Sequence, residues 1–528
     1  MTKTKSHSAK RRDQERGRRF SKRHPRTAEL LRDALCFGTI AAATLLVYHR
    51  ATHYFFAQDD FTSLWIAGEA PKTFWRILSS FVYFRAAGSL FGLNPVAFHV
   101  ASLLLHMANG ALVFLLARAF SAGRMASLVA AILFVVHPAL YFPIYAISSI
   151  GEILSCLFVL SASLYLLRAR KPEAPAAIPI VCILFAASLL SKETTIAFPV
   201  LAIFIFAARG VRIRRALPVL LALALVAVVY GALFYFADVF GIKQVVSNAF
   251  GTKEAPSPGG AAYATSLGPE LLTCLQTYFK WTFNVFEGWR HFQFNVLDKR
   301  ALVWLLLGVV LFLLLLGRRG AHRVKSAYGV SWFLLMLLPV IPLTNHPYHY
   351  YLYVPLAGLC PAVGVVLARW LRKSSGETLA SVCIIVFFVV NSALLMSKTE
   401  SATVSNSDRR KDSVFDRAIV AGNLIGDLRD VELSRGTKLV LISPLREITK
   451  GRMAENRWLV MGGSYWDTNL RSAVAEGLGV RLFFPQVDTV AFAEELTPEY
   501  NGFLAFGYLW NGHLRPLSPQ ETSPRPGP

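Results

Sequence analysis

The chain has 528 residues, of which 54% are hydrophobic and only 16% are charged. Soluble domains carry about 25% charged residues, so this composition excludes an ordinary soluble protein and indicates a polytopic membrane protein. The net charge of +23 gathers in residues 1–32 and in short clusters between apolar stretches. Clusters of this kind are typical of cytoplasmic loops, and they argue against nucleic acid as a partner.

Apolar stretches of the length that crosses a bilayer, roughly 20 residues, recur along the chain. They predict an α-helical polytopic membrane protein with roughly eleven transmembrane helices. The predicted spans are 33–53, 95–117, 125–140, 144–167, 176–191, 194–208, 216–238, 300–317, 327–343, 350–370 and 377–396.

Basic residues between these spans fall on the same side as the basic tail 1–32. They are Arg118 and Arg124; Arg168, Arg170 and Lys171; Arg209, Arg212, Arg214 and Arg215; Arg318, Arg319, Arg323 and Lys325; and Arg369, Arg372 and Lys373. The pattern predicts a multi-pass protein of the cell's inner (plasma) membrane with a cytoplasmic N-terminus.

The domain 33–396 then presents a first loop, 54–94, and a large loop, 239–299, on the extracytoplasmic face. Two amphipathic stretches, 72–91 and 267–287, read as helices lying at the membrane interface, although 267–287 can also be a further span.

Beyond residue 397 the charges balance and short β-rich runs appear at Thr437–Ser443, Arg457–Met461, Val480–Phe484 and Phe503–Trp510, with a turn at Gly462-Gly463. We expect a small extracytoplasmic α/β domain over 397–515 and a disordered tail over 516–528. The six cysteines form no CxxC pair, so neither a disulfide framework nor a zinc site is indicated.

Asp59 and Asp60 follow the first span, in the sequence Gln58-Asp59-Asp60-Phe61. Adjacent carboxylates that are partly desolvated raise each other's pKa, which suits a general base acting on a hydroxyl group. The same pair can hold a divalent cation such as Mg²⁺ or Mn²⁺ through oxygen ligands. The structural alternative is a solvated turn that caps the next helix.

Charged residues in or beside the membrane form a second set of candidates. Lys192 and Glu193 form a corner between two spans, and Lys192 can hold a lipid-linked phosphate or snorkel to the surface. Glu152 lies within a span, where a carboxylate is costly and marks a functional candidate. Arg76 and Arg85, in 72–91, can meet a lipid phosphate.

Histidines and aromatic residues form a third set. His99 and His106 share one helix face, and His137 lies at the outer end of the next span. Together they can hold a metal or serve as buried hydrogen-bonded side chains. His349 and Tyr350 belong to a polar aromatic run that can stack a sugar ring or form an interfacial belt.

Five motifs follow one another between residues 58 and 355. They are Gln58-Asp59-Asp60-Phe61, Phe91-Gly92-Leu93-Asn94-Pro95 with His99 and His106, Phe134-Val135-Val136-His137-Pro138, Ser191-Lys192-Glu193, and Tyr351-Leu352-Tyr353-Val354-Pro355. This order resembles the GT-C fold glycosyltransferases that use polyprenyl-phosphate sugars. The nearest group is the transmembrane O-mannosyltransferases linked to tetratricopeptide repeats, and the resemblance covers residues 33–396.

The resemblance implies transfer of a sugar from a polyprenyl-phosphate donor to an acceptor (a protein, lipid or glycan) on the extracytoplasmic face. By resemblance, Asp59 or Asp60 is the base, and Lys192 or Arg76 contacts the donor phosphate. The chain differs from the group in Ile150-Gly151 before Glu152, in His349-Tyr350, and in lacking the repeats. Two alternatives remain: a transporter or lipid flippase, and a non-catalytic assembly protein.

Overall fold

The computed structural model describes the chain in segments, and every structural statement below concerns these residues. They are 25–69, 75–120, 123–239, 265–285, 303, 305–310, 312, 321–344, 346–371, 376–403, 409–442, 470–493, 495–509 and 511–517.

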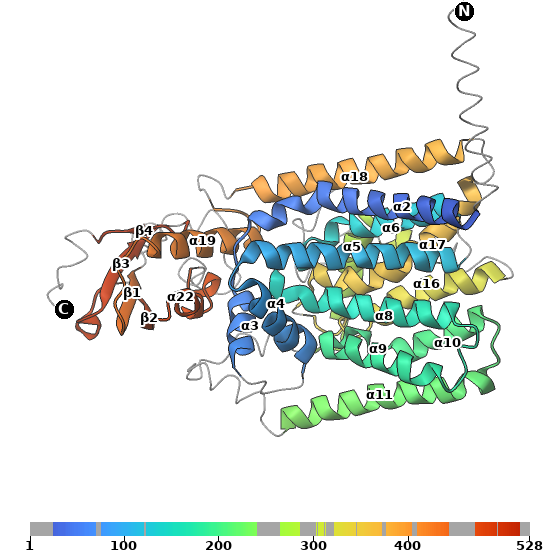
Figure 1. The fold of residues 1–528 in the computed structure, drawn as a ribbon, viewed down its shortest axis with the longest axis horizontal. Helices are drawn as coiled ribbons and strands as arrows, with labels where there is room; N and C mark the ends of the chain where they lie inside the picture. The colour runs from blue at the N-terminus through green and yellow to red at the C-terminus, as the bar shows by residue number, and fades with distance from the viewer. Residues whose placement is uncertain are drawn as a thin grey trace, which may run out of the picture.

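A bundle of long helices forms the body of the protein, with their axes running roughly in one direction (Figure 1). These helices are α2 (Pro25–Tyr48), α5 (Pro95–Ala119), α6 (Arg124–Val135), α8 (Ile150–Arg168), α9 (Ala177–Ser191), α10 (Phe198–Ala208), α11 (Ile213–Val239), α16 (Ala321–Leu337), α17 (Tyr353–Leu371) and α18 (Glu377–Ser401).

Six described helices are long and apolar enough to cross a membrane, and a bent pair makes up to seven. The pair joins α6 to Pro138–Tyr145 through a bend of 50°. Since each such helix can span the hydrocarbon core alone, the chain is a multi-pass membrane protein. The predicted spans 95–117 and 377–396 coincide with α5 and α18. The predicted span 300–317 lies largely outside the described residues, so the count of eleven stays a prediction.

Local sequence explains where α5 begins. The side chain of Asn94 accepts a hydrogen bond from the backbone N–H of Val96, and Pro95 occupies the first turn, where a backbone donor has no helical partner. Deeper in the bundle, Asn109 of α5 donates to the carbonyl of Ile153 at 2.9 Å and to the Tyr353 hydroxyl at 3.2 Å. These bonds join α5 to α8 and α17 through groups that would be costly to leave unpaired in lipid.

Short helices gather at one end of the bundle. They are η1 (His49–His53), α3 (Asp59–Gly68), the π-helical turn η2 (Leu78–Val82), α4 (Tyr83–Phe91), η3 (Pro138–Leu140), α7 (Phe142–Tyr145), η4 (Ile147–Ser149), η5 (Glu193–Thr195) and η7 (His349–Leu352). The C-terminal segment, which comprises the described residues from Ser413 onward, lies at this same end, beside α3, whereas α2 begins at the opposite end (Figure 1).

The C-terminal segment contains a four-stranded sheet in the order β2-β1-β3-β4. Strands β1 (Thr437–Ile442), β2 (Val487–Ala493) and β3 (Leu504–Tyr508) are parallel, and β4 (Leu514–Arg515) pairs antiparallel with β3. Helix α19 (Ser413–Leu428) contacts β4, and helix α22 (Leu478–Phe483) contacts β2. The short turn η9 (Pro498–Tyr500) precedes β3.

One β-rich run was predicted wrongly. Val480–Phe484 lies mostly in α22 rather than in a strand, because α22 starts after Gly477, whose φ of +84° turns the chain, and then packs against α3. Arg457–Met461 and the turn at Gly462-Gly463 lie outside the described residues, as does the tail from 518 onward.

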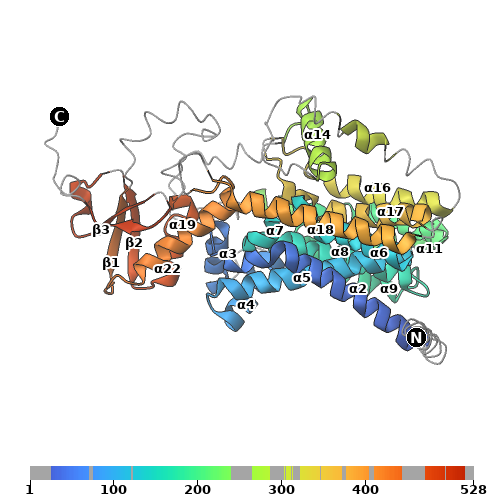
Figure 2. The same ribbon diagram turned by 90° about the horizontal axis from the view of Figure 1, so that it is seen from above.

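The two amphipathic stretches both contain helices. Described residues of 72–91 form η2 and α4, and 267–287 contains α14 (Glu270–Phe283). Figure 2 shows α14 on one side of the bundle, near α16. With 14 residues, α14 is shorter than the roughly 20 needed to cross a bilayer.

Candidate functional site

A tight turn sets the two aspartates in place. Gln58 has φ +50° and ψ −114°, a conformation that costs a residue with a side chain about 1–3 kcal/mol. Helix α3 begins at the next residue, so Asp59 and Asp60 occupy its first turn, where the helix dipole favours negative charge.

The two carboxylates have different surroundings. Asp60 is 3% exposed, and its two oxygens accept the backbone N–H groups of Ala57 at 3.0 Å and Ser148 at 2.6 Å. It thereby ties the start of α3 to η4. Asp59 is exposed, and its carboxylate is the one open to an incoming molecule.

Burial raises the pKa of Asp60 to about 7, although the N–H groups of Ala57 and Ser148 oppose the rise. Desolvation by the surrounding protein also raises the pKa of Asp59. The positive charges of Arg417, Arg76 and Lys192 oppose that rise. Three cations from distant parts of the chain therefore lie within electrostatic reach of Asp59.

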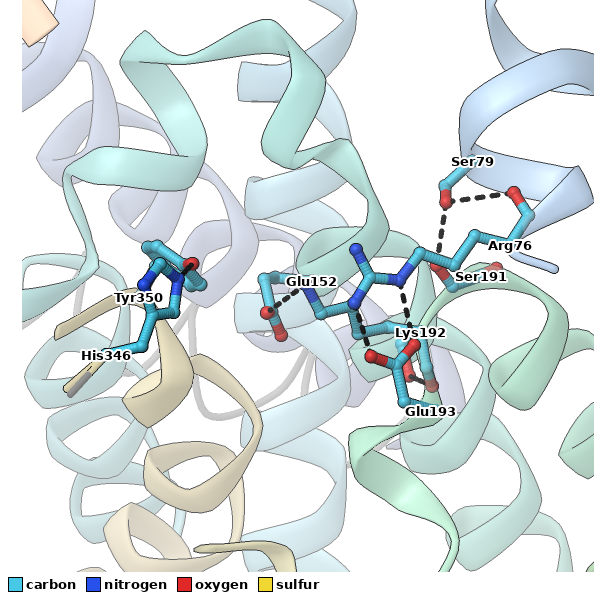
Figure 3. Close-up of polar contacts among 9 residues, drawn as sticks. Arg76, Ser79, Glu152, Ser191, Lys192, Glu193, His346 and Tyr350 are labelled. Carbon is cyan, nitrogen blue, oxygen red and sulfur yellow. Dashed lines mark hydrogen bonds and ion pairs between the residues drawn. The ribbon is translucent and has the colours of Figure 1, made fainter. Parts of the chain in front are cut away.

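Four charged side chains form two ion pairs (Figure 3), and the two cations among them are the Arg76 and Lys192 that act on Asp59. The guanidinium of Arg76 donates through two nitrogens to both carboxylate oxygens of Glu193, and Lys192 Nζ lies 3.3 Å from Glu152 Oε1. Arg76 also lies over the Trp75 ring. The quartet Arg76, Glu152, Lys192 and Glu193 has no net charge, and it holds two cations in fixed positions.

Close backbone packing positions the corner that carries Lys192. Ser79 donates its hydroxyl to the carbonyl of Ser191 at 2.7 Å. A Cβ on Gly151 would lie 2.8 Å from that same carbonyl oxygen. The absence of a side chain at Gly151 therefore lets η2 and α8 approach the Ser191-Lys192 corner.

Aromatic side chains cover the lysine of the quartet. Lys192 Nζ lies 5.5 Å from the ring centre of Tyr350 and 5.6 Å from that of Tyr351, within the range of cation–π attraction. His346 Nε2 lies 3.3 Å from the Tyr350 hydroxyl. His349 instead stacks on Tyr141, with ring centres 4.9 Å apart.

The other predicted histidines are buried and separately hydrogen-bonded. His99 contacts the carbonyl of Ile144. His106 contacts the Tyr353 hydroxyl at 2.6 Å and the carbonyl of Val135 at 3.0 Å.

His137 caps η3, its Nδ1 accepting from the N–H of Ala139, and its other ring nitrogen lies 3.1 Å from the carbonyl of Thr282. Among the described residues, no group of three or more His, Cys, Asp or Glu side chains is arranged to hold a metal ion.

Arg85 does not join the quartet in the described part of the chain. Its guanidinium donates to the carbonyl of Ala67 at 2.9 Å and reaches that of Gly68 at 3.4 Å. These are the last carbonyls of α3, which carry partial negative charge. Of the two arginines singled out in 72–91, the structure thus brings only Arg76 to the quartet.

Sequence reasoning missed two residues at this end of the protein. Arg417 of α19 donates to Gln58 Oε1 across 359 residues of sequence. Glu400 of α18 accepts from the Tyr145 hydroxyl and pairs with Arg50. Neither residue stands in a motif, so the sequence carries no signal for either contact.

Together, the fold and this site define a class: a multi-pass helical membrane protein with a charged site at the end of the bundle that bears the C-terminal segment. Residues 81–235 match the model of the family described as dolichyl-phosphate-mannose-protein mannosyltransferase. The resemblance predicted from the motifs is confirmed over those residues.

The proteins that are similar to this chain include one curated relative and one solved structure. The Drosophila melanogaster protein O-mannosyl-transferase Tmtc1 is 30% identical over 139 residues, which are 26% of this chain and 16% of that protein. The chain thus spans about a sixth of the length of this curated relative. The crystal structure of ArnT from Cupriavidus metallidurans bound to undecaprenyl phosphate is 14% identical, with a TM-score of 0.42, over 72% of this chain and 69% of that one.

Proposed function

We propose that the protein is a membrane glycosyltransferase that moves a sugar from a polyprenyl-phosphate donor to an acceptor hydroxyl on the extracytoplasmic face. The observation that carries the proposal is the exposed carboxylate of Asp59, set within electrostatic reach of Arg76 and Lys192. The family match over residues 81–235 supports the same reaction class.

Asp59 is the proposed general base, because its carboxylate is open whereas both oxygens of Asp60 hold backbone N–H groups. Asp59 takes the proton of the acceptor hydroxyl, and the acceptor oxygen forms a bond to the anomeric carbon. The bond from that carbon to the phosphate oxygen breaks, and its electron pair stays on the phosphate. An in-line displacement of this kind inverts the anomeric centre.

Arg76 and Lys192 are the proposed contacts for the donor phosphate. Each is held by a carboxylate partner, so the cations are oriented before the donor arrives and need little reorganisation. The phosphate gains negative charge as the sugar leaves, and cations already in position stabilise that charge. Tyr350, whose ring lies over Lys192, is the proposed border of the sugar site.

In this proposal the domain 33–396 carries the chemistry in the inner (plasma) membrane, with the tail 1–32 cytoplasmic and the domain 397–515 extracytoplasmic. In Figure 1, α3, α4 and the C-terminal sheet lie at one end of the bundle, so the first loop and the domain 397–515 share one face in this proposal.

The test is transfer by the full chain in lipid discs. The protein is given polyprenyl-phosphate hexoses with candidate protein, lipid and glycan acceptors, and released polyprenyl phosphate is measured. Release that needs both an acceptor and Asp59 establishes the transferase. If folded protein releases none with any of these donors, the function is transport of a lipid or an assembly role.

A further inference from the structure

The turn before Asp59 is held from outside the transmembrane bundle. The backbone N–H of Gln58 donates to the carbonyl of Ala473 at 2.8 Å, and the side-chain oxygen of Gln58 accepts from Arg417. Both partners belong to the C-terminal segment. A strained backbone persists only when its surroundings hold it in place. Here the two Gln58 contacts add to the hydrogen bonds that Asp60 makes with the backbone N–H groups of Ala57 and Ser148.

Apolar packing strengthens the same junction. Phe483 of α22 packs against Phe55 and Phe61, with ring centres 5.2 and 6.4 Å apart. A Cβ on Gly479 would meet the ring of Phe61 at 2.9 Å. The first loop and the C-terminal segment thus share a packed interface on both sides of Asp59.

Arg417 differs from the two cations of the quartet. Arg76 and Lys192 each have a carboxylate partner, whereas the described side chains give Arg417 none at ion-pair distance, and its Nε is buried without a hydrogen-bond partner. Its one side-chain hydrogen bond in the described structure is to Gln58. Its positive charge therefore acts on the turn itself and on the neighbouring Asp59.

We propose that Arg417 is a positioning residue for the transfer reaction: by holding Gln58 it fixes the strained turn that presents Asp59, so that the C-terminal segment completes the site. The proposal rests on the proposed function. A base displaced by about 1 Å loses much of its effect on rate, so a contact two residues from the chemistry can control turnover without touching substrate.

Four variants of the full chain test the proposal: Arg417→Ala, Arg417→Lys, Gln58→Ala and the double variant Gln58→Ala/Arg417→Ala. We expect Arg417→Ala to lower kcat at least tenfold while the KM for the donor stays within twofold, and Arg417→Lys to recover part of the loss. Because both residues act through one contact, the double variant should be no slower than Arg417→Ala.

A pH profile adds a readout that a purely structural role would not move. Among the described residues, the charged or titratable groups that face Asp59 are Arg417, Arg76, Lys192, Asp60 and Tyr348. Removing the cation at 417 should move the acidic limb of kcat/KM to higher pH, because a nearby positive charge favours the ionised base. Arg429→Ala, at the exposed end of the same helix, is the matched control and should leave kcat and the profile unchanged.

Hydrogen exchange of the backbone amides of residues 54–62 tests the positioning contact independently of the proposed transfer reaction. Arg417→Ala should speed exchange there even if no donor is turned over, so the positioning contact can be tested without activity. Unchanged kcat and exchange in Arg417→Ala overturn the proposal. The proposal is also overturned if Arg417→Ala raises the KM for the donor and the double variant loses activity by the product of the two single losses. Arg417 would then bind the donor phosphate directly. If Arg417→Ala does not fold, the same kcat, KM and hydrogen-exchange measurements are made on Gln58→Ala and Arg417→Lys.

Discussion

Asp59 and Asp60 are consecutive residues whose carboxylates face opposite surroundings: that of Asp59 is exposed, while that of Asp60 is buried against two backbone N–H groups. One helix turn thus offers one open carboxylate and one that holds the turn together. The pair consequently separates into a proposed chemical role and a structural one, and substitutions can tell them apart.

Asp59→Asn should slow transfer sharply while leaving folding intact, because the amide cannot take the acceptor proton. General bases contribute about 10²- to 10⁴-fold, so kcat should fall by about that factor. Released polyprenyl phosphate is the measurement, with size-exclusion behaviour as the check on folding. Activity within a few-fold of wild type would remove Asp59 from the role of base.

Asp60 should make stability depend on pH. Its pKa is raised from about 4 to about 7 by burial, so its neutral form is favoured in the folded protein. The stability that this provides is complete below about pH 4 and is lost as pH rises through 7, at up to about 1.4 kcal/mol per pH unit.

Thermal unfolding in detergent between pH 4.5 and 8 measures this effect. The wild type should lose stability relative to Asp60→Asn across that window, because the amide does not titrate. Parallel curves for the two proteins would show that Asp60 ionises in the fold as it does in water.

The pair of Lys192 and Glu152 should show separable roles in folding and transfer. Lys192→Met leaves Glu152 without its buried partner, at a cost of about 3–5 kcal/mol. Adding Glu152→Gln removes that unpaired charge, so the double variant should regain most of the lost thermal stability. Transfer should stay low in the double variant because the proposed phosphate contact is gone. A double variant with wild-type transfer would exclude Lys192 as that contact.

Gly151→Ala should displace the corner that carries Lys192. The new methyl group would lie 2.8 Å from the Ser191 carbonyl oxygen and 3.1 Å from Ser79 Oγ, and overpacking of this kind costs about 1–3 kcal/mol. Gly38→Ala, where nothing lies within 4 Å of the added Cβ, is the control. We expect a lower thermal midpoint and slower transfer for Gly151→Ala alone. Equal thermal midpoints and transfer rates in the two variants would mean that the Ser191-Lys192 corner accommodates the added methyl group without cost.

The helical body could be predicted from the sequence because long apolar runs have few alternatives in lipid. The predicted span 95–117 and helix α5 (Pro95–Ala119) coincide within two residues. The run Val480–Phe484 shows the limit of such reasoning. Its β-branched and aromatic residues favour a strand, yet packing against α3 and the turn at Gly477 select a helix.

The site could be predicted only in part. Asp59, Lys192 and Glu152 stand out because charge is costly near a membrane, and the structure brings Lys192 and Glu152 together. Their roles stay predictions. Arg417 could not be found in the same way, because an arginine in a charge-balanced segment carries no such cost, and its contact with Gln58 spans 359 residues.

That span has a consequence for biosynthesis. The ribosome makes the first loop long before Arg417, and at about 5–20 residues per second the interval is roughly 20 to 70 s. During this interval the turn at Gln58 is without its partner, and Phe55 and Phe61 are without Phe483. The nascent chain therefore exposes an unfinished aromatic surface, which a chaperone can bind until synthesis ends.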